Sequence, residues 1–268
     1  MTNEPVLLSS DTDGVRTLTL NRPQRKNAIS GQLWAALRTA LGEIADDREI
    51  RAVIVTGAGE SFCAGADIAD AEGVDDFPDP TRELHTINET SQRLHELPVP
   101  TLAKVRGVAV GAGWNLALAC DLVVATPEAR FSQIFARRAL SLDCGGSWLL
   151  PKLVGLQQAK RLALLAEMIQ TPEAHELGLV TWVRSGETID AFADDMARRL
   201  AAGPPLALRQ TKALLNAGAD RTLPEALDAE AQAAGLNLSG PDVIEAFAAW
   251  AEKRDPVYTG AANSASTQ

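Results

Sequence analysis

Short apolar segments alternate with longer amphipathic segments along the first two-thirds of the chain, whereas the last quarter carries helical patterns only. Residues 15–20 alternate between apolar and polar side chains and follow residues 6–10 across Asp-Thr-Asp-Gly, which predicts a β-hairpin. Residues 52–55, 101–105 and 122–125 are apolar without alternation, as expected for strands that are covered on both faces. The pattern predicts a layered α/β core followed by helices.

Helices are predicted between and after these strands. The first covers residues 31–46, with Ser30 as its N-cap. Thr171 is predicted to cap a short helix that ends at Gly178, and a last strand is predicted over 179–183. The other predicted helices cover residues 82–96, 114–120, 147–153, 156–168, 188–202, 206–217, 224–238 and 241–254.

The change from mixed to all-helical patterns sets the expected domain organisation. We expect an α/β core over residues 1–190, a C-terminal helical region over 191–258, and a disordered tail over 259–268. A helical appendage of this kind often covers a site or forms a subunit contact.

Composition narrows the class of protein. The 268 residues carry a formal net charge of −10 at pH 7, so the chain lacks the overall basic balance of a nucleic-acid binder, and no nucleic-acid partner is expected. The cysteines are odd in number and lack metal-ligand spacing, which indicates a reduced, cytoplasmic protein. No signal peptide is evident and no apolar run reaches membrane-spanning length, so no membrane span is expected.

Two glycine-rich stretches each follow a predicted strand. Gly107, Gly111 and Gly113 precede an apolar helix, and Gly65 has a similar place after the strand at 52–55. Backbone N–H groups at a helix start are unpaired, and the helix dipole there favours negative charge. Each stretch alone can be only a tight turn. Together, the two stretches could give one N–H each to a carbonyl oxygen that becomes an oxyanion.

Carboxylates are the best acid–base candidates in the chain. His85, His95 and His175 have no partner at metal-ligand spacing, and no nucleophile elbow, phosphate loop or dinucleotide fingerprint is present. Asp143 lies alone among apolar residues, directly before a predicted helix. Burial would raise the pKa of its carboxyl group, whereas the helix N-terminus would lower it. The alternative is that Asp143 only caps the helix that begins near Gly146.

Several motifs occur in a characteristic order. They are Asn21-Arg-Pro with Lys26-Asn-Ala28, Phe62-Cys-Ala-Gly-Ala-Asp-Ile68, Gly107-Val-Ala-Val-Gly-Ala-Gly113, Cys120-Asp-Leu-Val-Val-Ala125 with Ala129-Arg-Phe131, Asp143-Cys-Gly-Gly with Leu150-Pro, and Glu252-Lys-Arg-Asp-Pro256. With this set, the chain resembles the enoyl-CoA hydratase/isomerase (crotonase) superfamily over residues 5–258. The resemblance implies a crotonase-like α/β fold, with a layered ββα spiral core and a C-terminal helical trimerisation region.

The resemblance also implies a substrate and a site. The substrates are acyl-CoA thioesters, and the shared step forms a thioester enolate whose oxygen is held by the backbone amides of Ala66 and Ala112. The last helix often approaches the CoA from a neighbouring subunit of a homotrimer or hexamer. The residues that the resemblance assigns to substrate binding are Lys26, Ala28, Ala64, Gly65, Asp67, Ile68, Gly111, Asn115, Phe135, Trp250 and Lys253.

Departures from the family pattern bear on the reaction. The two glutamates with which family hydratases handle water are replaced by Asn115 and Phe135, neither of which can act as a general base. Asp143 instead matches the single aspartate of a branch that resembles the ring-epoxide-CoA isomerases of phenylacetate breakdown. The same position carries a nucleophilic aspartate in aryl-CoA dehalogenases, but their tryptophan near position 135 is absent. Phe135, Trp148 and Leu142 are candidates for the acyl end of the pocket, or for core residues.

Three hypotheses follow. The first is an acyl-CoA isomerase in which Asp143 moves a proton while the amides of Ala66 and Ala112 hold the enolate. This chemistry needs no metal or redox cofactor, because the coenzyme A is part of the substrate. The second is an enoyl-CoA hydratase in which Asp143 alone positions water. The third is a non-catalytic acyl-CoA binder, since fold alone does not fix function.

Overall fold

The computed structural model describes residues 4–67 and 79–260, so that Ile68 and the last eight residues of the expected tail lie outside the described part of the chain. Its main sheet has six strands in the order β1-β2-β3-β4-β6-β9. The pair β1 and β2 is antiparallel and forms the expected hairpin, and every other neighbouring pair is parallel. The strands are β1 (Leu7–Thr12), β2 (Val15–Leu20), β3 (Ala52–Gly57), β4 (Thr101–Val105), β6 (Leu122–Ala125) and β9 (Trp182–Val183).

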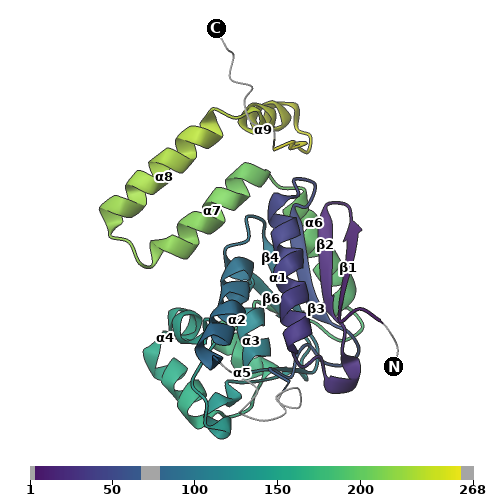
Figure 1. The fold of residues 1–268 in the computed structure, drawn as a ribbon. Coiled ribbons are helices and arrows are strands. Elements are labelled where there is room, and N and C mark those ends of the chain that lie inside the picture. The colour runs from purple at the N-terminus through teal and green to yellow at the C-terminus, as the bar shows by residue number, and fades with distance from the viewer. Residues whose placement is uncertain (1–3, 68–78, 261–268) are drawn as a thin grey trace.

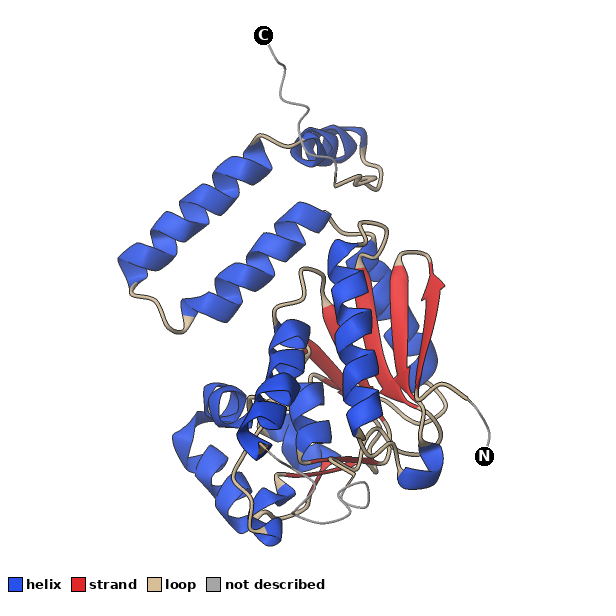
Figure 2. Ribbon diagram, in the orientation of Figure 1, coloured by secondary structure: helices blue, strands red, loops and turns tan. Residues whose placement is uncertain are grey.

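Helices cover both faces of this sheet (Figures 1 and 2). Val53 and Val55 of β3 belong to a core that includes apolar residues of α1 (Gly31–Asp46) and α3 (Ala112–Ala119). Ile54 points to the other face and packs in a cluster with α6 (Ile189–Ala201). The first five residues of β3 are therefore all buried, which explains why the strand shows no polar alternation.

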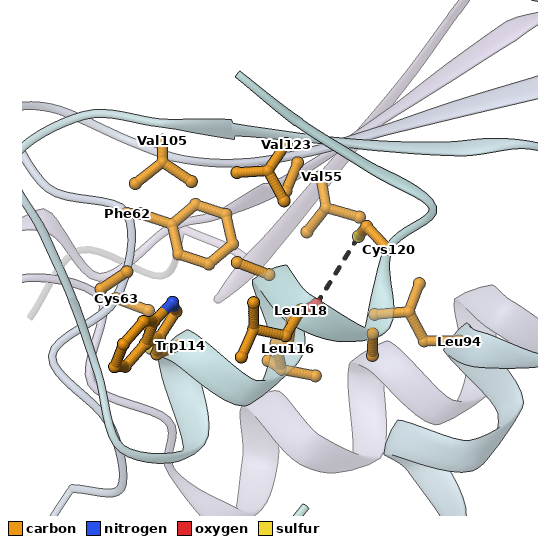
Figure 3. Packing of buried hydrophobic residues seen from close by; sticks show 14 of the residues in the cluster. Val55, Phe62, Cys63, Leu94, Val105, Trp114, Leu116, Leu118, Cys120 and Val123 are labelled. Carbon is orange, nitrogen blue, oxygen red and sulfur yellow. Dashed lines mark hydrogen bonds between the residues drawn. The ribbon is translucent and has the colours of Figure 1, made fainter. Parts of the chain in front are cut away.

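The core between the sheet and α3 is closely packed. Trp114 and Leu116 of α3 lie with Phe62, Cys63 and Val105 in one buried cluster, and Trp114 is 5.5 Å from the ring of Phe131 (Figure 3). Phe62 and Cys63 precede Gly65, so their burial fixes the segment that leads to this glycine.

A second, smaller sheet of three strands was not expected from the sequence. It has the order β5-β7-β8, and the strands are β5 (Val108–Val110), β7 (Arg130–Ser132) and β8 (Ile169–Gln170). β5 and β7 are parallel, and β8 is antiparallel to β7. β5 leads directly into the start of α3, so this sheet determines where α3 begins.

The remaining helices are close to those expected. Ser30 caps α1 by accepting a hydrogen bond of 3.3 Å from the amide of Leu33. The predicted helices at 147–153 and 156–168 form one run that is broken at Gly155, where φ is 74°. The other elements are α2 (Pro80–His95), α4 (Gly146–Leu165), α5 (Thr171–Glu176), α7 (Pro205–Gly218), α8 (Leu223–Leu238), α9 (Pro241–Glu252), and the short 3-10 helices η1 (Pro23–Arg25) and η3 (Ile134–Arg138).

Two local predictions were wrong. Thr171 is not the N-cap of α5, because its hydroxyl group donates instead to the carbonyl of Thr126 at 2.6 Å and ties α5 to the end of β6. The last strand covers only Trp182–Val183, because this is the part that pairs with β6.

The helical C-terminal part extends away from the sheet. Although the helical region is expected to begin at residue 191, α6 packs on the sheet, and it is α7, α8 and α9 that reach outward (Figure 1). Thr259 and Gly260 belong to the expected tail, and both of their amides donate to the carboxylate of Asp242.

Candidate active site

The first half of the candidate site is formed where the segment at 62–65 runs beside β5. The amide of Cys63 donates to Val108 at 2.9 Å, and the amide of Val110 donates to Cys63 at 3.0 Å. Gly65 follows with a φ of 94°, and a Cβ at this position would lie 2.8 Å from the carbonyl oxygen of Val110 and 4.0 Å from the amide nitrogen of Ala112. The turn that carries Ala66 and the start of α3 are therefore in direct contact.

Among the described residues, neither the amide of Ala66 nor that of Ala112 donates to a backbone carbonyl in a turn, loop or cap. Ala112 is the first residue of α3, where a backbone N–H has no partner inside the helix. Ala66 forms a parallel bridge with Ile29 through the carbonyl of Gly65 and the amide of Asp67. In this arrangement the N–H of Ala66 itself faces away from Ile29. The two glycine-rich stretches are thus brought together as the sequence suggests.

The two segments expected to line a CoA site lie side by side. The carbonyl of Lys26 accepts a hydrogen bond of 2.9 Å from the amide of Ala64, and the amide of Ile29 donates to Gly65 at 2.8 Å. Lys26 is exposed and has a φ of 49°, whereas Ala28 is buried. The exposed cationic side chain of Lys26 is therefore on the loop that is bonded to the Ala64–Gly65 turn.

Buried polar side chains hold this pair of segments in place. The guanidinium group of Arg22 lies 2.7 Å from the carboxylate of Asp67 and also donates to the carbonyl of Ala28 at 2.6 Å. The side chain of Asn27 is fully buried and donates to the carbonyls of Ala58 and Ser61. Asp67, expected among the substrate-binding residues, thus forms an ion pair inside the protein. The roles of Arg22 and Asn27 were not identified from sequence, although the motif that contains them was.

The second half of the candidate site is the turn that carries Asp143. This residue lines a cavity of about 430 Å³ between α2 and the start of α4, together with Ser91, His95, Leu142 and Trp148. Burial raises the pKa of the Asp143 carboxyl group above its ordinary value, and a hydrogen bond with the Cys144 side chain opposes that effect. Oδ1 of Asp143 is buried and has no hydrogen-bond partner among the described residues.

Asp143 does not act as a helix cap. The N-cap position of α4 is Gly145, and no side chain accepts a hydrogen bond there. The alternative interpretation, in which Asp143 only caps the helix, is therefore excluded. Its carboxylate remains available as a base whose proton affinity is increased by desolvation.

Asn115 joins the two halves of the site. It lies in the first turn of α3, one turn after Ala112, and its Nδ2 donates to the backbone carbonyl of Asp143 at 2.8 Å. The side chain, expected among the substrate-binding residues, is fully buried, and its Oδ1 accepts a hydrogen bond of 2.8 Å from Gln133. Gln133 was not identified from sequence, because an isolated glutamine before a short 3-10 helix gives no signal of its own.

Of the remaining expected site residues, Phe135 lies close to the start of α3, whereas Trp250 and Lys253 lie far from it. Phe135 is buried beside Gly111, where an added Cβ would be 3.7 Å from the Cζ atom of the ring. Trp250 is 81% exposed at the end of α9, and Lys253 follows it. Within one chain, α9 lies beyond α7 and α8 and is well separated from α4 (Figure 1). A single protomer therefore does not bring these two residues to Asp143.

The described part of the chain shows no candidate metal site. No cluster of three or more histidine, cysteine or acidic residues with metal-binding geometry occurs among residues 4–67 and 79–260. His95 packs against Trp148 with ring centroids 5.2 Å apart, and burial lowers the pKa of its imidazole.

Among residues 4–67 and 79–260, no helix combines the length and the apolar character needed to cross a bilayer.

Comparison with solved structures defines the class of fold. The chain superimposes on enoyl-CoA hydratase from Bacillus anthracis with a TM-score of 0.92 at 32% identity, covering 96% of this chain and 100% of that one. The predicted crotonase-like α/β fold is confirmed by this similarity.

Sequence comparison identifies the family. The model for enoyl-CoA hydratase/isomerase matches residues 10–261. The chain is 38% identical over 257 residues to 1,2-epoxyphenylacetyl-CoA isomerase from Escherichia coli (strain K12), with 95% of this chain and 98% of that protein covered. It is 34% identical over 250 residues to short-chain-enoyl-CoA hydratase from Clostridium acetobutylicum, with 90% and 92% covered. The chain belongs to the enoyl-CoA hydratase/isomerase family, and acyl-CoA binding follows from that membership.

Proposed function

We propose that this protein is an acyl-CoA isomerase that moves a double bond by proton transfer through an enolate. The observation that carries the proposal is the position of the Asp143 turn against the first turn of α3. Through Asn115, Asp143, a buried carboxyl group with a raised pKa, is held next to the helix that presents the amide of Ala112. A base on the turn before α4 and an amide at the start of α3, joined through Asn115, supply the two parts that this reaction needs.

The proposed reaction has two proton transfers and no net change in composition. The carboxylate of Asp143 takes a proton from a carbon next to, or conjugated with, the thioester. The electron pair released from that C–H bond moves toward the carbonyl, whose oxygen becomes an enolate oxygen. The amides of Ala66 and Ala112 donate hydrogen bonds to this oxygen, and such donors contribute roughly 3 to 4 kcal/mol each in known enzymes. Protonated Asp143 then returns the proton to another carbon, so that the double bond has moved.

The local environment supports Asp143 in this role. A carboxylate with a raised pKa is a stronger base, so burial helps Asp143 take up the substrate proton. The positions that would hold the two glutamates of a hydratase are Asn115 and Phe135, and both side chains are buried. The relative from Escherichia coli supports the proposal in so far as it is named an isomerase of a CoA thioester.

Deuterium exchange tests the proposal. Purified protein and the Asp143→Asn variant are incubated with 2-enoyl- and 3-enoyl-CoA thioesters in D₂O, and product mass and double-bond position are measured. We expect deuterium uptake with migration of the bond in the wild type and neither in the variant. Asp195→Asn is the matched control, because Asp195 is an exposed partner of Arg198 on α6. Full exchange in Asp143→Asn would contradict the proposed base.

Hydration is the second candidate function, and it is favoured by the relative from Clostridium acetobutylicum, which is named a hydratase. In that reaction Asp143 would position a water molecule instead of moving a substrate proton. The same experiment separates the two reactions, because hydration adds the mass of one water without bond migration. Tight binding of the thioesters without any exchange or addition would point to a non-catalytic binder.

We also propose that the protein works as a homotrimer or a hexamer in the cytoplasm. Ile244, Phe247 and Trp250 on α9 are each more than 60% exposed, which is unusual for a surface that faces water alone. Assembly through α7–α9 would cover them and could bring Trp250 and Lys253 to the CoA of a neighbouring subunit. The three free, buried cysteines agree with a reducing compartment.

A further inference from the structure

The turn at Asp143–Gly145 is held by hydrogen bonds to its backbone. The carbonyl of Asp143 accepts from Asn115 Nδ2 at 2.8 Å and from the amide of Gly146 at 2.9 Å. The amide of Cys144 donates to Asn88 Oδ1 at 2.9 Å. In contrast, Oδ1 of the Asp143 side chain has no partner among the described residues. The direction of the carboxylate is therefore set by the backbone that carries it and by its one side-chain contact, with Cys144.

The amide group of Asn115 has only one orientation that satisfies its neighbours. Its Oδ1 accepts a hydrogen bond of 2.8 Å from Gln133 Nε2, so its Nδ2 must face the Asp143 carbonyl. Both side chains are fully buried, and no water is needed to complete the contact. The hydrogen bonds run in one direction, from Gln133 through Asn115 to the backbone of Asp143. A carboxylate at position 115 would have no proton to donate to that carbonyl.

Packing around Asn115 leaves little freedom for movement. A Cβ at Gly146 would lie 2.5 Å from Asn115 Nδ2, so the start of α4 rests directly on the amide group. A side chain at position 146 would force the two helices apart. The contact between α3 and α4 is thus made by a glycine and a fixed amide.

We propose that Asn115, oriented by Gln133, is a positioning residue that fixes the base Asp143 relative to the oxyanion site. The inference rests on the proposed function of Asp143. Asn115 would act without contacting substrate, and it would do so at the position where a hydratase carries a glutamate. A displacement of about 1 Å in a reacting group can lower a rate by roughly 100-fold, so such a fixed contact has a measurable effect.

Steady-state kinetics of the isomerisation test this inference. For Asn115→Ala we expect kcat to fall roughly 10- to 100-fold, with KM for the CoA thioester changed by less than about 3-fold. Gln133→Leu is expected to lower kcat by a smaller factor. Because Gln133 acts through Asn115, the double variant should be no slower than Asn115→Ala alone. Asn237→Ala is the matched control, since this asparagine donates to Gln210 on the outlying helices α7 and α8.

A second variant guards against loss of folding. Asn115→Leu has a similar shape but can neither accept from Gln133 nor donate to Asp143. We expect it to fold, as judged by its thermal unfolding, and to lose kcat like Asn115→Ala. A folded Asn115→Leu with wild-type kcat would overturn the inference. So would a loss that appears in KM alone, or rate factors of Asn115→Ala and Gln133→Leu that multiply in the double variant.

The Asp143→Asn variant is measured in the same series to keep the two proposals apart. If Asp143→Asn is inactive and the Asn115 variants are normal, only the positioning role is wrong. If Asp143→Asn retains activity, the base assignment is wrong, and the positioning role is overturned with it. Inactive Asp143→Asn together with a selective loss of kcat in the Asn115 variants supports both.

Discussion

Gly65 touches the turn before α3 so closely that an added Cβ would lie 2.8 Å from the carbonyl oxygen of Val110 and 4.0 Å from the amide nitrogen of Ala112. The residue also has a φ of 94°, a conformation that other residues rarely adopt. The amides of Ala66 and Ala112 are thus placed by a residue that contributes no side chain. Their relative position depends on the absence of a methyl group.

Substitution of Gly65 by alanine is therefore expected to separate the two amides. The new methyl group would push against the backbone at Val110, and we expect kcat/KM to fall by at least 100-fold. Gly178→Ala is the control, because Gly178 also has a positive φ, of 79°, but has open space at its Cβ position. It should lose about 1 to 2 kcal/mol of stability from backbone strain alone and keep its activity. If Gly65→Ala kept the same kcat/KM as Gly178→Ala, the proposed oxyanion site would be contradicted.

The pH dependence of kcat should reflect the raised pKa of Asp143. Burial disfavours the charged carboxylate, so activity should fall with decreasing pH at a value above the ordinary aspartate pKa. The measurement is a pH–rate profile with a substrate that has no titrating group in this range. A profile that stays flat down to the ordinary aspartate pKa would show that another group is the base.

The same pKa shift predicts how stability changes with pH. Since the pKa of Asp143 is higher in the folded protein than in the unfolded chain, its contribution to stability is complete below the unfolded pKa and is lost as pH rises through the folded pKa. Asp143→Asn removes the ionised form and should unfold at a higher temperature than the wild type at neutral pH. At a pH below the unfolded pKa this difference should vanish, which thermal denaturation at the two pH values would detect.

The buried ion pair between Arg22 and Asp67 should matter for both stability and binding. The two side chains are only 14% and 6% exposed, so Arg22→Met would remove a cation that lies 2.7 Å from a buried carboxylate. We expect a loss of about 3 kcal/mol in the free energy of unfolding and a raised KM for the CoA thioester. The control Arg93→Met breaks a pair whose side chains are 47% and 48% exposed, and it should leave the unfolding midpoint unchanged.

Assembly can be tested through the exposed apolar residues of α9. The double variant Ile244→Asp, Phe247→Asp is expected to dissociate the oligomer, because each aspartate would be buried in a contact between subunits. Light scattering after size-exclusion chromatography should give a multiple of three protomer masses for the wild type and a single protomer mass for the variant. Leu8→Asp on the edge strand β1 is the control and should retain the assembly. A monomeric wild type would contradict the proposed trimer.

The elements that could be predicted from sequence are those with a strong local signal. The β1–β2 hairpin follows from alternation and a turn, and α1 from its apolar face and the Ser30 cap. The second sheet was missed because β5 and β7 have only three residues each, and they form by pairing across the intervening helix α3. Such short strands depend on tertiary contacts that no local pattern encodes.

The candidate site shows the same division. The glycines and Asp143 stand out in the sequence, since they interrupt apolar segments, and the structure brings the two glycine turns together. Gln133 and Asn88 do not stand out, because ordinary amide side chains acquire a role only when folding places them beside a particular backbone group. The contact of Asp67 with Arg22 also depends on the fold, which pairs two loops that are far apart in the chain.

The proposed oxyanion donors, the amides of Ala66 and Ala112, and the proposed base Asp143 lie on separate segments of the chain, and this separation has a consequence for evolution. Both donors are backbone groups, so the side chains at positions 66 and 112 are free to vary as long as the neighbouring turns keep their shape. The proton-transferring residue sits on another loop and can be relocated without disturbing those turns. Related proteins with this fold can therefore keep the two amides that stabilise the enolate. They can change the reaction that follows enolate formation by moving or replacing the proton-transferring residue.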